Sequence, residues 1–487
     1  MKRMIRSVIG SSAVLSLVAF GTLGAVKVPA AKSVPGAHLK AHLKVFDWLC
    51  FSQNSAPGFA STVLKSYRKT HPGIRLTIVP PPTNASNFVL WENTVLAEGT
   101  APQIIAPPVA MEPWQDIPRH WYMNLTGLMN APDPYVPGNH HLYGLFAPKV
   151  RQELQFHRQY WSIAWSGQDA GIWYNKTDFR KAGIHQVPTT WGQFLQDMRK
   201  LKQIGVIPMG FDLGDTVYGD PIPSVMAALE SLTMQPIFNQ LTHSQTKLVT
   251  VPELVRAIDT GAFRTTNPRY EAAWKLLKAW SAYFEPGAAG VGTGSATNNS
   301  QTMFERGKVA MFYAGSYVIP ALNKMPDLNY GVFPIPQLTK KTSSAATPGY
   351  HGTGVWGGWG ACPFAVTSTA KTTHTAAAVD NFIQYLSVPK NQERFAWDSG
   401  YVSNAPGTPV GGPPKTRALL ETVRYIMDHP SRISEAETAL GPGFEQSQVK
   451  VMQSYVDGQL SLGQAMSQME NLFRQAALQT KTWVGGQ

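Results

Sequence analysis

Apolar residues recur along the chain with a helical period in some segments and a two-residue period in others, and the two kinds of segment alternate. Residues 44–50 predict an apolar strand, and Pro57 opens a helix that ends before Gly73. Residues 74–79 then alternate between apolar and polar as a second strand. The buried face of the helix is predicted to carry Phe59, Val63, Leu64 and Tyr67. A strand–helix–strand unit requires a crossover, so the pattern predicts an α/β fold.

Further helices are predicted in the middle and at the end of the chain. Thr190 and Gln193 have the spacing of a capping box. The helix that they begin is predicted to bury Trp191, Phe194, Leu195, Met198, Leu201 and Ile204. A second helix is expected over 271–284, a loop over 286–300 and a last amphipathic helix over 462–476. Residues 31–44 are interpreted as a polar leader.

The first 30 residues have the pattern of a secretory signal peptide. Lys2, Arg3 and Arg6 precede an uncharged stretch, and small residues follow at Ala30 and Ala31, so cleavage is expected near Ala30. An uncleaved membrane anchor is the alternative, because the stretch is long enough to span a bilayer. Since no cysteine precedes Cys50, the exported protein is not expected to be a lipoprotein.

Length and charge narrow the class of protein. The 487 residues suggest two or three domains, and only 15% of them are charged, with a net charge of +12. Removal of the signal peptide takes away four basic residues and no acid, which lowers the net charge to +8. With no long basic run, this charge argues against a nucleic-acid partner. Sparse carboxylates on an exported protein favour the hypothesis of an acidic exterior.

Catalytic and metal-binding patterns are weak. Gly352, Gly354 and Gly357 match a dinucleotide motif without its strand and helix, and residues 368–371 match S-x-x-K without its companion motifs. His140-His141 lacks a third ligand, so neither a metal nor a cofactor is predicted. A secreted glycoside hydrolase is the enzymatic alternative, because it would need two carboxylates and an aromatic cleft. Its candidate carboxylates are Asp212, Asp215, Asp220 and Glu305.

Cys50 and Cys362 each lie beside an apolar run. An oxidising exterior would allow the two to pair, whereas two buried free thiols are the alternative. The residues alone leave both possibilities open.

The segment 172–204, IWYNKTDFRKAGIHQVPTTWGQFLQDMRKLKQI, resembles the family 1 extracellular solute-binding proteins of ABC importers, of the sugar-binding type. The shared features are a strand ending in Tyr-Asn-Lys, then Gly, Pro and Thr-Trp at the start of a helix. Blocks at 65–79, 97–105, 303–322, 330–336, 357–387 and 457–473 agree with the family in the same order. Two features depart from it, namely Gln103 in place of an Asp and the absence of a lipid-attachment cysteine.

The resemblance implies a two-lobed, periplasmic-binding-protein-like α/β fold of type II, in which a hinge joins two mixed sheets flanked by helices. It places lobe 1 at 44–158 and 330–410, and lobe 2 at 159–329 and 411–487. Both cysteines then fall in lobe 1, which favours a Cys50–Cys362 disulfide.

The resemblance also implies a set of ligand-binding residues. Tyr317 and Tyr218 match stacking aromatics of the family, and Gln168 lies in a loop that supplies a polar contact. Further candidates are chosen because they match a ligand-binding position of the family or because they are aromatic residues in Gly-rich or loop segments. They are Gln53, Asn54, Trp114, Trp165, Trp356, Trp359, Phe444 and Glu445. For any single Trp, core packing is the alternative.

These observations predict the exported, monomeric substrate-binding component of a carbohydrate ABC importer, which is not an enzyme. It would hold a mono- or oligosaccharide between its lobes and deliver it to the permease subunits. The alternatives are a secreted carbohydrate-active enzyme and a relative that binds peptides or polyamines, which should have acidic cleft residues.

Overall fold

The computed structural model describes residues 34–47, 56–80, 88–106, 117–211, 213, 222–242, 248–288, 297–352, 363–429, 433–434, 440 and 442–484. The predicted signal peptide and both cysteines lie outside these ranges. The elements of the first half are β1 (Ala41–Asp47), α1 (Pro57–Phe59), η1 (Ala60–Leu64), α2 (Lys65–Thr70), β2 (Ile74–Val79), α3 (Phe88–Ala97), β3 (Ile104–Ala106), α5 (Thr126–Asn130), η3 (Leu142–Leu145), α6 (Pro148–Glu153), β4 (Gln155–Phe156), β5 (Gln159–Tyr160), β6 (Ser162–Ile163), β7 (Ser166–Gly167), β8 (Ala170–Asn175), α7 (Lys176–Lys181), α8 (Trp191–Gln203), β9 (Ile207–Gly210) and α9 (Ile222–Thr233).

The elements of the second half are α10 (Gln235–Leu241), β10 (Leu248–Val249), α11 (Val251–Thr260), α12 (Pro268–Ser281), α13 (Thr297–Glu305), β11 (Val309–Gly315), η4 (Ser316–Val318), α14 (Ile319–Leu322), β12 (Tyr330–Phe333), β13 (Phe364–Val366), α15 (Thr369–Thr372), α16 (Ala376–Ser387), α17 (Pro389–Asp398), β14 (Val402–Ser403), α18 (Pro414–Asp428), β15 (Ile433–Ser434), α20 (Pro442–Val456) and α21 (Leu462–Val484). The predicted capping box of α8 is confirmed, since the Thr190 hydroxyl accepts from the Gln193 amide and the Gln193 side chain reaches back to Thr190.

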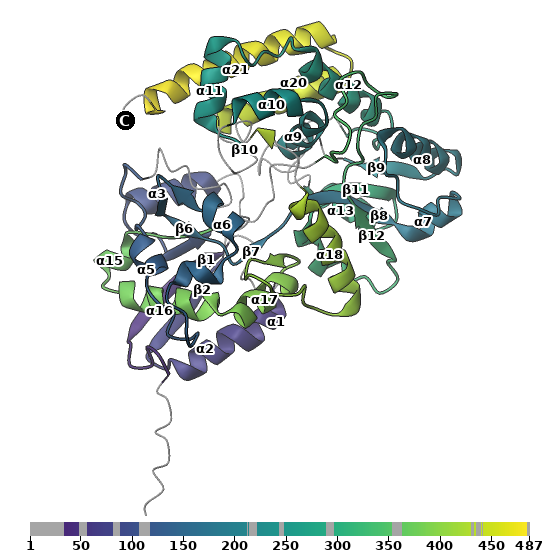
Figure 1. Ribbon diagram of the computed structural model, residues 1–487. Helices are drawn as coiled ribbons and strands as arrows, with labels where there is room; N and C mark the ends of the chain where they lie inside the picture. The colour runs from purple at the N-terminus through teal and green to yellow at the C-terminus, as the bar shows by residue number, and fades with distance from the viewer. Residues whose placement is uncertain are drawn as a thin grey trace, which may run out of the picture. The chain divides into compact units, whose positions relative to one another are not determined.

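The first sheet is mixed and has the strand order β2-β1-β3-β13-β6. Its β1 pairs in parallel with both β2 and β3, which confirms the predicted strand–helix–strand unit (Figure 1). The prediction of a polar leader up to residue 44 is wrong, because β1 already begins at Ala41. His42 and Lys44 are exposed while Leu43 and Val45 are buried, so the segment is a half-buried strand whose outward residues are polar.

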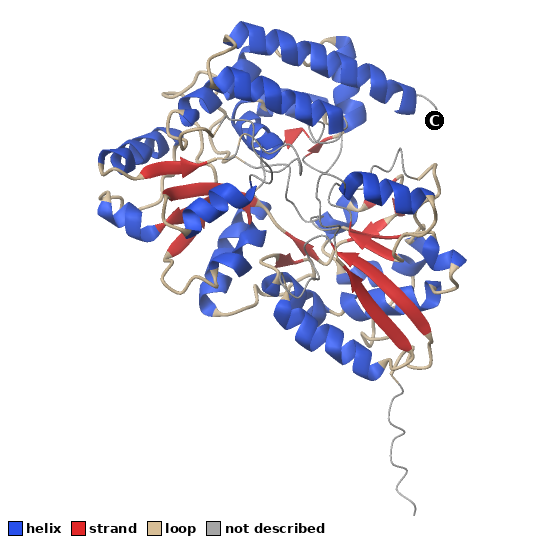
Figure 2. Cartoon of the chain, turned by 180° about the vertical axis from the view of Figure 1, so that it is seen from behind, coloured by secondary structure: helices blue, strands red, loops and turns tan. Residues whose placement is uncertain are grey.

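Three strands of the first sheet, β1, β3 and β13, contribute to two cores, because alternate side chains point to opposite faces. On one face Val45, Ile104 and Val366 join the core that contains α2 and α16. On the other face Phe46 and Ile105 pack in a smaller core with Leu96 of α3. The central part of this sheet is therefore packed on both faces, with helices on either side (Figure 2), while the start of β1 leaves His42 and Lys44 exposed on one face.

The second sheet is also mixed and has the order β12-β8-β11-β9. Ile172 and Met311 face the core formed with α8, α9 and α12. Trp173 and Phe312 face the opposite side, where the Trp173 indole donates to the Ala314 carbonyl at 2.9 Å. Both predicted helices around 191–204 and 271–284 thus cover this sheet. The predicted loop over 286–300 ends earlier, because α13 begins at Thr297.

Sheet membership cuts across two of the predicted lobe boundaries. β6, at 162–163, belongs to the first sheet although lobe 2 was predicted to begin at 159. β12, at 330–333, belongs to the second sheet although lobe 1 was predicted to resume at 330. Both strands lie where the chain passes from one sheet to the other. The order of the family blocks along the sequence does not specify which of the two sheets such a strand joins.

A buried polar clamp, formed by His71, Tyr135 and Asn381, holds the backbone of Pro35. The Pro35 carbonyl accepts from the Tyr135 hydroxyl at 2.7 Å and from the Asn381 amide at 3.2 Å, and His71 Nε2 lies 2.9 Å from it. Gly36 follows with a φ of 72°, and a Cβ there would lie 2.2 Å from Asn381 Nδ2. Only glycine therefore fits beside the clamp.

Within the ranges that the structure describes, no helix combines the length and hydrophobicity needed to cross a membrane.

Candidate functional site

The pairing of β7 with β14 and of β8 with β11 brings Gln168 and Tyr317 close together. β7 pairs antiparallel with β14, Gly167 lying opposite Val402, and the chain then enters β8 through Gln168 and Asp169. β8 pairs antiparallel with β11, and Ala170 lies opposite Gly315. This register places the β7–β8 connection beside the end of β11, where Ser316 and Tyr317 begin η4.

Gly315 allows the two strongest predicted ligand residues to meet. A Cβ at this position would lie 2.5 Å from Gln168 Oε1 and 2.6 Å from Cε1 of the Tyr317 ring. Its φ of −68° and ψ of 167° are open to any residue, so a larger residue is disfavoured here only by the close approach of these two side chains, which would have to move. The structure thus places Gln168 and Tyr317 on either side of one backbone position.

Three buried polar atoms in this region have no hydrogen-bond partner among the described residues. They are the Ser166 hydroxyl, Gln168 Oε1 and the Ser316 hydroxyl. Buried polar groups are nearly always paired, because an unpaired one costs about 1–3 kcal/mol. A group of such atoms next to a half-buried tyrosine ring is typical of a site that a polar ligand or water completes. We name Ser166, Gln168, Gly315, Ser316 and Tyr317 the crossover site.

Asp169 follows Gln168 of the crossover site in the chain, and burial affects its charge. Its side chain is buried, and burial raises the pKa of its carboxyl well above the ordinary value, while the Ala170 amide donates to it at 2.7 Å and partly offsets this. Burial therefore favours the protonated, neutral form of this carboxyl. A neutral polar site suits a neutral polar ligand better than the cationic ligand of the polyamine alternative.

Residues on both sides of β14 contact the backbone of the crossover site. Gly400 has a φ of 82°, and a Cβ there would lie 2.5 Å from the Ser316 carbonyl and 3.0 Å from Pro320. Asn404 donates to the Ala164 carbonyl at 2.8 Å, just before Ser166. These contacts fix the backbone that carries the unpaired hydroxyls.

Two predicted ligand residues are core residues instead. Trp165 is 1% exposed, and its indole donates to the Ser387 hydroxyl at 3.0 Å while its ring packs on Phe364. Phe444 is 5% exposed and packs on Phe473, with ring centroids 4.8 Å apart. Neither ring has a free face, so the structure corrects both predictions in favour of core packing.

The side chains of the remaining predicted ligand residues lie outside the described part of the chain. Glu445 lies in α20 but its side chain is not described. The others lie outside the described ranges, namely Gln53, Asn54, Trp114, Tyr218, Trp356 and Trp359. Of the carboxylates considered for an enzyme, Asp212, Asp215 and Asp220 also lie outside, while Glu305 accepts from Gln301 at 2.8 Å.

Sequence reasoning missed Ser166, Ser316 and Gly315 as members of the site. Ser166 and Ser316 lie within two residues of predicted positions, but small hydroxyls carry no signal of burial. Gly315 lies within the family-like block 303–322, but its role depends on the register between β8 and β11. No group of three or more His, Cys, Asp or Glu side chains suited to a metal ion occurs among the described residues.

Two mixed sheets flanked by helices, with a neutral polar site at their crossing strands, define an α/β binding protein of the periplasmic-binding-protein type. The profile of the family described as "Bacterial extracellular solute-binding protein" matches residues 53–393. Because this match covers most of the chain, the chain belongs to that family, as the resemblance predicted. The members of this family bind solutes. The chain is therefore a binding protein, and the alternative of a secreted carbohydrate-active enzyme is not supported.

Individual relatives are more distant. The chain is 22% identical over 339 residues to the "Multiple sugar-binding protein" of Streptococcus mutans, which covers 68% of this chain and 69% of that protein. A solved structure of RafE in complex with raffinose covers 90% of this chain and all of its own, with a TM-score of 0.64 and 18% identity. A chitin oligosaccharide binding protein aligns over 90% of this chain and 99% of its own, again with a TM-score of 0.64 and 18% identity. These likenesses establish the fold.

Proposed function

We propose that this chain captures an oligosaccharide at the crossover site and delivers it to the membrane subunits of an ABC importer. The observation that carries the proposal is the set of three buried, unpaired polar atoms beside the Tyr317 ring. The family and the sugar ligands named for its relatives support it.

The chemistry of the site matches a neutral sugar. A sugar hydroxyl can donate to Gln168 Oε1 and accept from the Ser166 and Ser316 hydroxyls, which would remove the cost of their isolation. The C–H face of a pyranose can lie on the half-buried ring of Tyr317. Binding involves no covalent step, and release follows when these contacts open.

The crossing strands provide a route for closure on the ligand. β7 and β14 form a two-stranded ribbon whose residues lie next to Gln168, so a change in backbone angles there would move the site. Hinges of this kind consist of a few residues at the ends of elements. Closure of the two predicted lobes around the sugar would give the form that the permease recognises.

A thermal-shift screen with raffinose, maltose and chitin oligosaccharides tests the proposal, because a ligand that binds only the folded chain raises its Tm. Calorimetry with the best sugar then compares Tyr317→Ala with Tyr317→Phe. We expect the alanine variant to lose at least tenfold in affinity and the phenylalanine variant, which keeps the ring, to stay within about threefold. No shift with any sugar, or equal affinity in both variants and the parent, would contradict it.

A further inference from the structure

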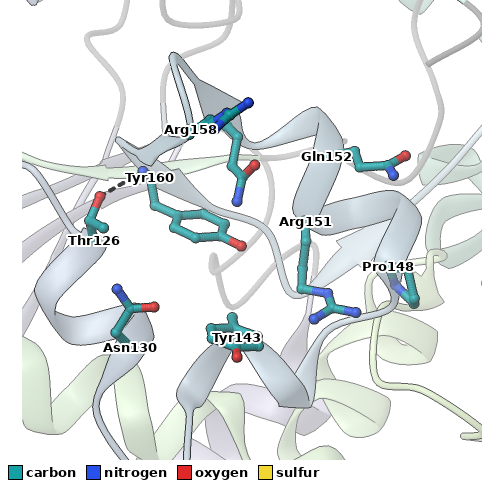
Figure 3. Close-up of a pocket in the computed structure, with 9 residues that line it drawn as sticks. Thr126, Asn130, Tyr143, Pro148, Arg151, Gln152, Arg158 and Tyr160 are labelled. Carbon is teal, nitrogen blue, oxygen red and sulfur yellow. Dashed lines mark hydrogen bonds between the residues drawn. The ribbon is translucent and has the colours of Figure 1, made fainter. Parts of the chain in front are cut away.

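A pocket of about 410 Å³ lies between α5, η3, α6 and the β4–β5 hairpin (Figure 3). None of the residues predicted from the family resemblance lines it, and neither does any residue of the crossover site. Pockets of this size hold small organic ligands. The pocket therefore needs an explanation of its own.

The lining of the pocket is basic and contains no acid. Its nine residues include Arg151 and Arg158 and no Asp or Glu. Among the ion pairs of the described residues, none involves either arginine. Two guanidinium groups that form no ion pair among the described side chains favour an anionic ligand.

The position of Arg151 is fixed in advance by aromatic rings. Its guanidinium lies over the Tyr143 ring, 5.3 Å from the centroid, and the other partner of that ring is His141, stacked at 5.0 Å with an interplanar angle of 3°. A cation–π contact orients the guanidinium without neutralising it. His141 is held in turn by Asn130, whose carbonyl lies 2.8 Å from its Nδ1. Arg151 is therefore preorganised to bind an anion.

Arg158 is presented by a strained turn. The two residues of the hairpin turn, His157 and Arg158, have φ values of 49° and 61°. Phe156 pairs with Gln159 across them, so this is a two-residue hairpin of the kind that glycine and asparagine usually form. Arginine is rarely found in this conformation, and such strain is concentrated at ligand sites. The turn places Arg158 at the rim of the pocket (Figure 3).

The floor of the pocket offers hydroxyl and amide groups. Tyr160 is 5% exposed, and its phenol oxygen points into the space between Asn130, Tyr143 and Arg151 (Figure 3). Burial raises the pKa of Tyr160, and the Gln155 side chain and the charge of Arg151 lower it in part, so both groups lie close to the phenol. Thr126 Oγ1 accepts from the Tyr160 amide at 3.0 Å, which fixes the strand. Amides and hydroxyls around two arginines match a polyhydroxylated anion.

We propose that this pocket is a second ligand site, which takes a sugar bearing an oxyanion. Arg151 and Arg158 bind the carboxylate or phosphate, while the Tyr160 hydroxyl and the amides of Asn130, Gln152 and Gln155 bind the sugar hydroxyls. The site is separate from the crossover site and does not depend on the function proposed there.

Isothermal titration calorimetry on the full exported chain tests the proposal. The probes are D-glucuronate, D-glucose 6-phosphate, D-glucose, inorganic phosphate and sulfate. We expect saturable binding of glucuronate or glucose 6-phosphate at least tenfold tighter than of glucose and of the two inorganic ions, and the tighter of the sugar anions identifies the charged group. Arg151→Gln and Arg158→Gln should each weaken this binding at least tenfold, and 0.5 M NaCl should weaken it further.

The control variant is Arg199→Gln, which removes the same charge from the exposed surface of α8 and should leave binding unchanged. Tyr317→Ala should also leave it unchanged, which separates this site from the crossover site. Absence of saturable binding, equal binding of inorganic phosphate, or binding that survives both pocket variants would overturn the proposal. Circular dichroism and an unchanged Tm show that the variants are folded.

Discussion

A methyl group added at Gly315 is the sharpest test of the crossover site. In Gly315→Ala the backbone can stay where it is, because its φ and ψ suit alanine. The new Cβ would lie 2.5 Å from Gln168 Oε1 and 2.6 Å from Tyr317 Cε1. Since ordinary contacts begin at 3.4 Å, both side chains must move by about 1 Å. The variant therefore displaces two proposed ligand contacts at once and removes no atom.

The expected loss of affinity follows from those two contacts. A displaced hydrogen bond costs about 0.5–1.5 kcal/mol and a displaced ring contact about 0.5–1.5 kcal/mol, or about 1–3 kcal/mol together. Affinity should fall about 5–150-fold in calorimetry with the sugar that gives the largest thermal shift. Gly463→Ala in α21 is the matched control, because no heavy atom lies within 4 Å of its added Cβ. If both variants bind within twofold of the parent chain, Gln168 and Tyr317 do not hold the ligand.

Three further predictions concern stability. Burial raises the pKa of Asp133 and of Asp380 to about 6, above the unfolded value of about 4. The contribution of these two carboxyls to the free energy of unfolding is therefore complete below pH 4 and is lost as the pH rises through 6. The Tm should accordingly be higher at pH 5 than at pH 7. A Tm that falls steadily from pH 7 to pH 5 would refute this. Trp165→Ala should lower the free energy of unfolding by about 3–5 kcal/mol in urea, and a loss below 1 kcal/mol would show that the ring is not a core residue. Asn381→Ala removes an acceptor of the Tyr67 and Tyr135 hydroxyls and a donor to the Pro35 carbonyl, and should cost about 1–3 kcal/mol. Gln384→Ala, on the exposed side of the same helix, should cost less than about 0.5 kcal/mol, and equal losses in the two variants would contradict the role of the clamp.

The pH prediction bears on the hypothesis of an acidic exterior. That hypothesis rested on the small number of carboxylates in the sequence. Buried Asp133 and Asp169 and partly buried Asp380 add carboxyls whose surroundings favour the protonated form. The small number of carboxylates and the raised pKa values both reduce the stability that the folded chain loses on acidification. The dependence of Tm on pH tests the two together.

The sequence was informative wherever the cause of structure is local. The capping box of α8 is set by residues within one turn and was predicted at the correct positions. Of the predicted stripe, Trp191, Phe194, Met198 and Leu201 are buried and Leu195 is partly buried, whereas the prediction for Ile204 is wrong, because it follows the end of the helix and is 43% exposed. The start of β1 was missed because His42 and Lys44 made a strand with one wet face look like a leader. Alternation over four residues is too short to separate the two interpretations.

The site was harder to predict because its members meet through long-range pairing. Gln168 and Tyr317 came from family position, and their contact depends on Gly315 and the β8–β11 register. Trp165 lies close to Gln168 in the sequence, yet Ser387 and Phe364 take both its polar and its apolar surface. Whether an aromatic ring faces a ligand or a core is decided by partners more than 190 residues away in the chain.

The pairing of β3 with β13 and the clamp on Pro35 set the order in which the chain can fold. A ribosome must reach Val366 before β3 gains its second neighbour, and Asn381 before the Pro35 carbonyl gains one of its donors across a separation of 346 residues. Until then the first sheet keeps an open edge, and closing so large a loop is slow. The first sheet of a nascent chain therefore stays incomplete until most of the sequence has been synthesised.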